Sequence, residues 1–305
     1  MDSVKKGVLF VIVSAIIFGS TPILARLAYD EGANAATMVF LRAALAVPFL
    51  IVIMKIRKIP FATSLTEVRD LFLAGVAAAS ATILLYSSFT YISVGETMTL
   101  QFIYPALVSL GCVIFYKEKL TKPIIAALIL SIIGVSMFYE NISYDNDLER
   151  RGALGFTLAI VAGFTYAFYI IRVDKSSLRQ IPTPKITLAV CICAMICSGI
   201  AGLSGIAGGG LSFGLTAVGW LYAWIVALSV TLVAVVFLQL GIKRTGAPAA
   251  AILSTFEPIT SVLCGALFLG EHLSFPKIIG GICIIASVII VAKAGNGERE
   301  EKAGG

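Results

Sequence analysis

The sequence predicts an all-α integral membrane protein with ten transmembrane helices, arranged as two inverted five-helix repeats around a central cavity. Three observations support this fold. The 305 residues are 59% hydrophobic and only 13% charged, whereas soluble domains carry about 25% charged residues. The apolar residues form ten long runs, and one segment of the chain occurs twice. Lipid must therefore surround most of the chain, where only helices satisfy the backbone within a single segment.

The ten apolar runs are each long enough, or nearly so, to cross about 30 Å of hydrocarbon as a helix. Their approximate limits are 7–29, 35–54, 71–91, 96–116, 123–139, 152–171, 186–206, 218–240, 248–269 and 276–292. The fifth and tenth are the shortest, and they hold equivalent places in the two halves. The first run is too long for the apolar region of a cleaved signal peptide, so we expect a span there as well.

A duplicated segment divides the chain into halves. The residues PALVSLGCVIFYKEKL, from Pro105 to Leu120, recur in register as PITSVLCGALFLGEHL, from Pro258 to Leu273. The offset of 153 residues also pairs Glu118 with Glu271. Internal duplication of a span–loop–span unit is a common building plan of membrane transporters.

The basic residues predict the orientation of the spans. The N-terminus, the even-numbered connections and the C-terminus carry 18 of the 23 lysines and arginines. The positive-inside rule therefore places both termini in the cytoplasm. Five spans per half is an odd number, so the second half is expected upside down relative to the first. We expect a first repeat at 1–140, an inverted second repeat at 152–295 and a short charged cytoplasmic tail at 296–305.

Several other functional classes are disfavoured. The net charge of +6 does not indicate nucleic-acid binding, because the basic residues lie in short loops between apolar spans. The cysteines all fall within apolar segments and suggest neither a disulfide framework nor a metal site; the closest-spaced are Cys191, Cys193 and Cys197. His272 is the single histidine, so the sequence does not suggest a Ser-His-Asp catalytic triad. We expect no enzyme activity, no metal and no cofactor.

Four segments resemble a known family. They are FEPITSVLCGALFLGEHLS (256–274), YPALVSLGCVIFYKEKLT (104–121), IFGSTPILAR (17–26) and FLRAAL (40–45). Together they look like the EamA-type family of the drug/metabolite transporter superfamily, over nearly the whole chain. The resemblance implies a ten-helix, two-repeat transporter that exports or exchanges small metabolites across the plasma or inner membrane.

Glu257 is the leading candidate for a transport residue. It falls near the centre of the ninth run, where a carboxylate in lipid is costly and is expected to face a cavity or a partner. Its counterpart in the first half is Tyr104, with Gln101 one helical turn away. We expect Glu257 to bind an amine of the substrate or a coupling proton, with Gln101 and Tyr104 facing it. The alternative is a structural carboxyl group, hydrogen-bonded within the bundle.

Further polar residues in the spans are substrate-binding candidates. Tyr86 and Gln239 are equivalent by the 153-residue offset, and Tyr166 is expected to lie centrally; the tyrosines are alternatively ordinary core aromatics. Pro105 and Pro258 form an equivalent pair within their spans, where proline removes a backbone donor. We expect each proline to mark a hinge or helix break, the alternative being a simple packing kink.

Arg42 is the one basic residue placed clearly inside a span, about two turns from the outer surface. It is a candidate for attracting a substrate carboxylate or for pairing with Glu96 or Asp30. Alternatively, its guanidinium group extends to the lipid headgroups at the outer surface. Its position nearer the surface than the midplane favours the structural interpretation.

The sequence thus favours a secondary transporter that moves small metabolites by alternating access within the lipid bilayer. Amino acids or related compounds, moved outward, are the preferred substrates, with a proton as a possible coupling ion. One alternative is exchange of sugar phosphates or nucleotide sugars, which requires more buried lysine and arginine. An intramembrane enzyme requires clustered acids or histidines, which are not evident. A third alternative is a sensor or scaffold that binds a ligand without moving it.

Overall fold

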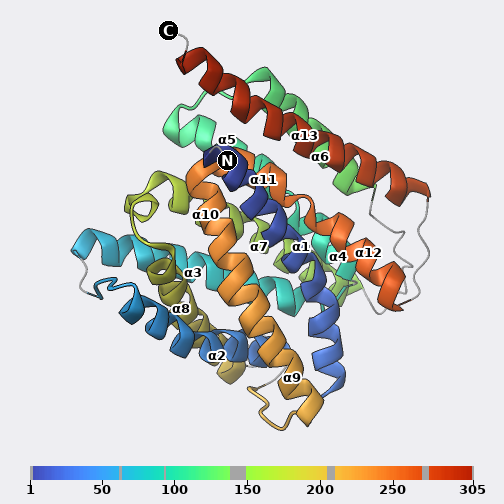
Figure 1. Ribbon diagram of the computed structural model, residues 1–305. Helices are drawn as coiled ribbons and strands as arrows, with labels where there is room; N and C mark the ends of the chain where they lie inside the picture. The colour runs from blue at the N-terminus through green and yellow to red at the C-terminus, as the bar shows by residue number, and fades with distance from the viewer. Residues whose placement is uncertain are drawn as a thin grey trace.

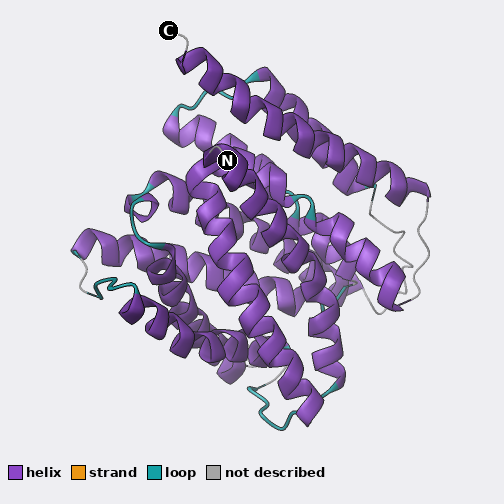
Figure 2. Ribbon diagram, in the orientation of Figure 1, coloured by secondary structure: helices purple, strands orange, loops and turns teal. Residues whose placement is uncertain are grey.

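The computed structural model describes residues 3–61, 64–92, 94–137, 149–204, 210–269 and 275–303. All regular elements within these residues are helices (Figure 2). The first half contains α1 (Ser3–Asp30), α2 (Ala35–Ile56), α3 (Leu65–Ser88), α4 (Val94–Gln101), α5 (Tyr104–Tyr116) and α6 (Lys122–Ser136). The second half contains α7 (Glu149–Lys175), the 3-10 turn η1 (Ser177–Arg179), α8 (Thr183–Ser204), α9 (Ala217–Val226), the π-helical η2 (Ala227–Ala234), α10 (Val235–Thr245), α11 (Ala247–Ser254), α12 (Glu257–Leu269) and α13 (Phe275–Ala303).

Six helical stretches are long and apolar enough to cross a membrane: α1, α2, α3, residues 152–175 of α7, residues 183–203 of α8, and the continuous helix 217–245 formed by α9, η2 and α10. Shorter apolar helices cover 104–116, 122–136 and 278–293. The chain is therefore an all-helical, multi-pass membrane protein, as the composition predicts. Helix α13 continues through most of the expected tail. Glu271, His272 and most of the junction between the halves lie outside the described residues.

The expected fourth and ninth spans are each divided into two helices. In the first half α4 ends at Gln101 and α5 begins at Tyr104, while in the second half α11 ends at Ser254 and α12 begins at Glu257. Each boundary in the second half lies 153 residues after its counterpart in the first. Each restarted helix has proline as its second residue, a position where the missing N–H costs no helical hydrogen bond.

Local signals in the sequence fix the ends of several helices. The side chain of Asn34 accepts the N–H of Thr37 at 2.9 Å and so caps α2, and Thr216 caps α9 by accepting the N–H of Gly219 at 3.1 Å. Such caps satisfy donors that the helix itself leaves unpaired. Between α10 and α11 the chain turns at Gly246, whose φ of +85° favours glycine.

The two halves are interleaved. Helix α1 packs against α10 and α12 of the second half, and α7 packs against α3, α4 and α5 of the first half. The pairs α2–α8 and α6–α13 join spans that are equivalent in the repeat; α6 and α13 lie side by side at one edge of the bundle (Figure 1). Each of these helix contacts therefore has an equivalent contact in which the two halves are exchanged.

Glycines allow the first span of each half to approach the break in the other half. A Cβ atom added at Gly19 of α1 would lie 2.5 Å from the carbonyl oxygen of Glu257. One added at Gly163 of α7 would lie 2.9 Å from the carbonyl oxygen of Gln101. Both distances are below the usual van der Waals contact, so these two backbone approaches require glycine. The two breaks are thus held in equivalent surroundings.

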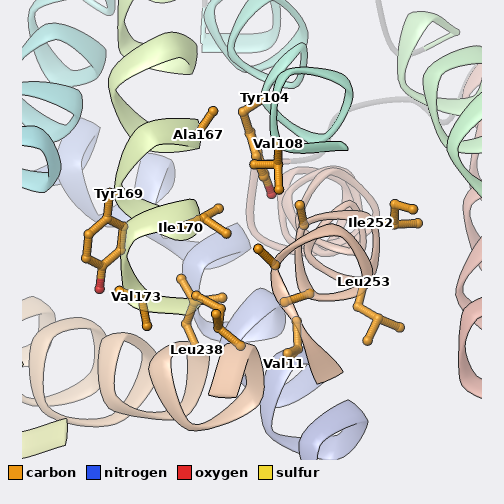
Figure 3. Close-up of a cluster of buried hydrophobic side chains, with 14 of the residues drawn as sticks. Val11, Tyr104, Val108, Ala167, Tyr169, Ile170, Val173, Leu238, Ile252 and Leu253 are labelled. Atoms are coloured by element: carbon orange, nitrogen blue, oxygen red, sulfur yellow. The ribbon is translucent and has the colours of Figure 1, made fainter. Parts of the chain in front are cut away.

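A fully buried apolar cluster fills the bundle where α5, α7, α10 and α11 meet (Figure 3). We call it the apolar plug and define it by Val108, Ile170, Val173, Leu238, Ile242, Ala247, Ala250 and Ala251, each at most 1% exposed. In Figure 3, Ile170 and Val173 project from α7 into this cluster. Side chains of this kind pack at crystal-like density, which leaves no passage for a solute.

Candidate functional site

A partly open cavity lies between the two halves, next to the apolar plug. About 780 Å³ is not occupied by protein atoms, a volume that includes open solvent at the mouth of the cavity. Helices α1, α2, α3 and α4 of the first half and α7, α8, α10 and α12 of the second line it. The lining residues are Phe18, Thr21, Pro22, Arg42, Ala78, Ala81, Thr82, Leu85, Tyr86, Phe89, Met98, Gln101, Tyr166, Tyr169, Val190, Val235, Leu238 and Glu257.

The cavity lies toward one end of the bundle. Its walls include Arg42, close to the start of α2, and Phe89, directly after α3. In the opposite direction Leu238 belongs both to the cavity wall and to the plug. A molecule in the cavity is therefore separated by packed apolar side chains from the end of the bundle where α5, α7 and α10 terminate.

Glu257 presents its carboxylate to this cavity. It is the first residue of α12 and is only 8% exposed. No ion pair joins it to any other residue that the structure describes. Its place at a helix N-terminus is favourable for a negative charge, because backbone N–H groups point toward it. The helix start thus favours a negative charge here, and the carboxylate remains available to a positively charged group.

Arg42 lines the same cavity from α2 and is also 8% exposed. Its Nη2 donates to Thr82 Oγ1 at 3.1 Å, and its guanidinium carbon lies 5.9 Å from the centre of the Tyr86 ring. Thr82 donates its own proton to the carbonyl of Ala78 at 2.9 Å, so its oxygen is left to accept from Arg42. A guanidinium has five N–H donors, so most of them remain free for a ligand.

The position of Arg42 differs from our expectation. The sequence favours a structural role near the outer surface, but the side chain lies on the wall that also carries Glu257. Within the described residues Arg42 forms no ion pair either. The cavity therefore holds one positive and one negative side chain, one from each half, without joining them to each other. This arrangement suits a ligand that carries both charges.

Aromatic rings form much of the remaining wall. Tyr166 packs edge-on against Tyr104, with ring centres 4.9 Å apart and planes at 82°, and lies nearly parallel to Tyr169 at 6.1 Å. Tyr86 packs against Phe89 at 5.8 Å. Tyr104 supports the wall from behind and is not among the lining residues. Such rings supply apolar contact area and, through their hydroxyl groups, hydrogen bonds.

Gln239 also stands behind the wall. Its Nε2 donates to the hydroxyl oxygen of Tyr169 at 2.9 Å, while Thr187 Oγ1 lies 3.1 Å from its Oε1. Gln239 and Thr187 are fully buried. Because Tyr169 accepts a hydrogen bond from Gln239, its own proton is left for a different acceptor. Gln239 therefore orients a tyrosine of the cavity and does not line the cavity itself.

The structure places four of the expected binding residues in the lining of the cavity: Glu257, Gln101, Tyr86 and Tyr166. Tyr104 and Gln239 contact lining residues from behind, and Pro105 and Pro258 lie directly after the two helix breaks. Arg42, for which the sequence favours a structural role, also lines the cavity, and an arginine within an apolar span is itself a sign of a functional site. Thr82 and Thr187 were not singled out, because threonine is frequent in spans and forms bonds within its own helix.

The fold and the cavity define a helical membrane protein of the transporter class. A family model, the EamA-like transporter family, matches residues 5–139 and 153–293. The chain therefore belongs to the EamA-like transporter family, which confirms the resemblance of the four segments and makes it a membrane transporter.

Relatives and a solved structure agree with this assignment. The chain is 25% identical over 304 residues to "Uncharacterized transporter YcbK" of Bacillus subtilis (strain 168), covering 96% of each. It is 23% identical over 301 residues to "Uncharacterized inner membrane transporter YicL" of Salmonella typhimurium (strain LT2), covering 96% of this chain and 97% of the relative. A solved structure titled "Crystal structure of protein" has a TM-score of 0.79 at 13% identity, with 96% of this chain and 98% of that chain covered. That likeness bears on the fold alone.

Proposed function

We propose that this chain is a secondary transporter that exports small zwitterionic metabolites, with amino acids and related compounds as the substrate class. The observation that carries this proposal is the pairing of Arg42 and Glu257 on one small cavity, neither neutralised by another described residue. Buried charges are normally paired. A substrate bearing a carboxylate and an ammonium group supplies both missing partners.

Each residue of the site has a proposed role. Glu257 binds the ammonium group, or a coupling proton when the site is empty of substrate. Arg42 binds the carboxylate through the N–H groups that Thr82 leaves free. Gln101 and Tyr169, which also line the cavity, donate hydrogen bonds to the substrate. The aromatic and aliphatic walls favour an uncharged side chain on the substrate.

The proposed architecture is ten spans in two inverted repeats, 1–140 and 152–295, with both termini on the cytoplasmic side of the plasma or inner membrane. The interleaved packing supports it, because exchange of the halves preserves the contacts between helices. The equivalent helix breaks before Pro105 and Pro258 support it further. In this proposal the breaks act as hinges, and the cavity opens alternately to the two sides.

The alternative of sugar phosphates or nucleotide sugars is less well supported by this cavity. A phosphate with two negative charges is commonly bound by several arginines or lysines, and Arg42 is the single basic residue among those that line the cavity. One arginine balanced by one carboxylate fits a substrate with no net charge.

The test is efflux from liposomes that contain the purified protein. They are loaded with a labelled mixture of amino acids or, separately, with labelled sugar phosphates, and efflux is followed with and without a pH gradient. We expect selective efflux of uncharged-side-chain amino acids, above that of protein-free liposomes. Efflux of sugar phosphates with retention of all amino acids would contradict the proposal and support the alternative.

A further inference from the structure

Asp174 is a buried carboxylate at the end of α7 that plays no part in the cavity. Its side chain is fully shielded from solvent. One oxygen accepts the backbone N–H of Ala247 at 3.1 Å and lies 2.9 Å from Lys175 Nζ. The other oxygen lies 3.1 Å from Arg179 Nη1. A buried carboxylate leaves a buried charge uncompensated when one of its partners is removed, so breaking such a contact is costly.

The partners of Asp174 come from separate elements. Ala247 is the first residue of α11, and Arg179 is the last residue of η1. Lys175 also pairs with Glu118, which follows the end of α5. The carboxylate thus fastens the start of α11 to α7 and η1, and through Lys175 it connects to α5. Because its negative charge faces the N–H at the first residue of a helix, the contact is charge-assisted.

Helix α11 forms one wall of the apolar plug. It contributes Ala247, Ala250 and Ala251, which are fully buried, and it packs against α5, α7 and α10. In Figure 3, Ile252 and Leu253 of the same helix project from the side turned away from α7. A solute that passes between the cavity and the charged end of the bundle must therefore displace α11 or its neighbours.

Helix α11 is short and has a potential hinge at each end. It has eight residues, it is preceded by Gly246, and it is followed by the break that ends at Glu257. Its two ends are thus a glycine turn and a helix break, both of which absorb changes in backbone angle. Among the described residues, the side chain fixing its first N–H is Asp174.

We propose that Asp174 is a latch that holds α11 in the closed position at the inner end of the transport pathway. When the contact between Asp174 and Ala247 breaks, α11 swings at the break next to Glu257, the plug opens and the cavity becomes accessible from the cytoplasm. This inference rests on the proposed transport function and on the proposed orientation. Asp174 touches no substrate, so it acts as a positioning residue for the gate.

The first half offers a matched control. Asp30 ends α1 and lies eleven residues after Gly19, and Asp174 lies eleven residues after Gly163, so the two acids hold equivalent positions after the two close-packed glycines. Asp30 is exposed and forms no hydrogen bond or ion pair with other described residues. Its replacement therefore removes an equivalent acid without a latch.

Cys112 provides a natural reporter of the plug. It is fully buried on α5, one turn from Val108 of the plug, and its carbonyl accepts the N–H of Glu118 at 3.2 Å. Displacement of α11 would expose its thiol. Cys197 on α8 is only partly buried and serves as an internal reference within the same molecule.

The experiment measures maleimide labelling of Cys112 by mass spectrometry in purified protein in detergent, for wild type, Asp174→Ala, Asp174→Asn and Asp30→Ala. Asparagine keeps an acceptor for Ala247 but loses the charge. We therefore expect Cys112 to be labelled fastest in Asp174→Ala, more slowly in Asp174→Asn and slowest in wild type. The increase for alanine is expected to be at least about tenfold, as for a two-state equilibrium that loses one charge-assisted contact. Asp30→Ala and the Cys197 signal should stay near wild type.

Equal Cys112 labelling in wild type and both Asp174 variants would overturn the latch. So would a rise of the same size in Asp30→Ala. Size-exclusion profiles show whether each variant folds. If Asp174→Ala does not fold, Cys112 labelling is compared between Asp174→Asn and wild type. The same variants are assayed for amino-acid efflux. Increased labelling in a protein that transports none of the substrates supports the latch while it contradicts the proposed function.

Discussion

Replacement of Glu257 by glutamine is expected to reduce amino-acid efflux from liposomes at least about tenfold and to remove its response to a pH gradient. The amide keeps the shape and one acceptor but loses the negative charge. A hydrogen bond to a charged group contributes roughly 1.5–3 kcal/mol, and about 1.4 kcal/mol corresponds to a factor of ten. The measurement is efflux of labelled substrate with and without an imposed pH gradient.

Glu67→Gln is the matched control for this variant. Glu67 is an acid at the start of α3, one-third exposed and distant from the cavity wall. It should export at the wild-type rate with the wild-type response to pH. If Glu257→Gln does the same, the carboxylate is structural, and the cavity is not the site at which charge is recognised.

Replacement of Gly19 by alanine is expected to be the most damaging of the single-methyl substitutions considered. The new Cβ would lie 2.5 Å from the carbonyl oxygen of Glu257 and 2.6 Å from the Cβ of Thr260. Backbone of α12 cannot move aside as a flexible side chain can, so α1 and α12 must separate. Overpacking of this kind typically costs about 1–3 kcal/mol. We expect a lower unfolding temperature in detergent and reduced efflux, because the helix break beside Glu257 shifts.

Gly199→Ala tests the same substitution without the clash. Gly199 lies within α8, and a Cβ there meets no other atom within 4 Å. Alanine has a higher helix propensity than glycine, so this variant should unfold at the wild-type temperature or slightly above. A Gly19→Ala protein as stable and as active as Gly199→Ala would show that α1 and α12 are free to separate.

The sequence predicts the helical membrane fold well, because composition and lipid solvation leave the backbone few alternatives. The duplicated segment also gives each half a proline as the second residue of a helix that restarts after a break. The number of ten spans remains a prediction: six stretches are clearly long enough, and the fourth and ninth are divided.

The site is predicted less completely, and two residues show why. Arg42 lies near the start of α2, so its distance from the surface suggests a structural role. In the folded chain, however, it lines the cavity. Gln239 has the right character for a binding residue, but its amide is used by Tyr169 and Thr187. The sequence of an all-apolar helix does not show which of its faces is turned inward. The spacing of residues therefore predicts neither the place of Arg42 at the cavity nor the hydrogen bonds of Gln239.

The gate depends on contacts that the sequence does not reveal. Asp174 follows the apolar run 152–171, and no feature of the sequence singles it out. In the folded chain it is buried against the start of α11. Pro258 predicts a break within the span to which α11 belongs, but nothing in the sequence pairs the start of α11 with Asp174.

The central claim is that Arg42 and Glu257 bind the two ends of one substrate, and a binding competition tests it most directly. The labelled probe is the amino acid with the largest efflux, and the competitors are its decarboxylated and deaminated analogues, with wild type, Arg42→Gln and Glu257→Gln in detergent. Wild type should bind each analogue at least about tenfold more weakly than the intact amino acid. Arg42→Gln should bind the amino acid and its decarboxylated analogue with equal affinity. Glu257→Gln should bind the amino acid and its deaminated analogue with equal affinity. Equal competition by all three ligands in wild type, or the same selectivity in both variants, would contradict the account.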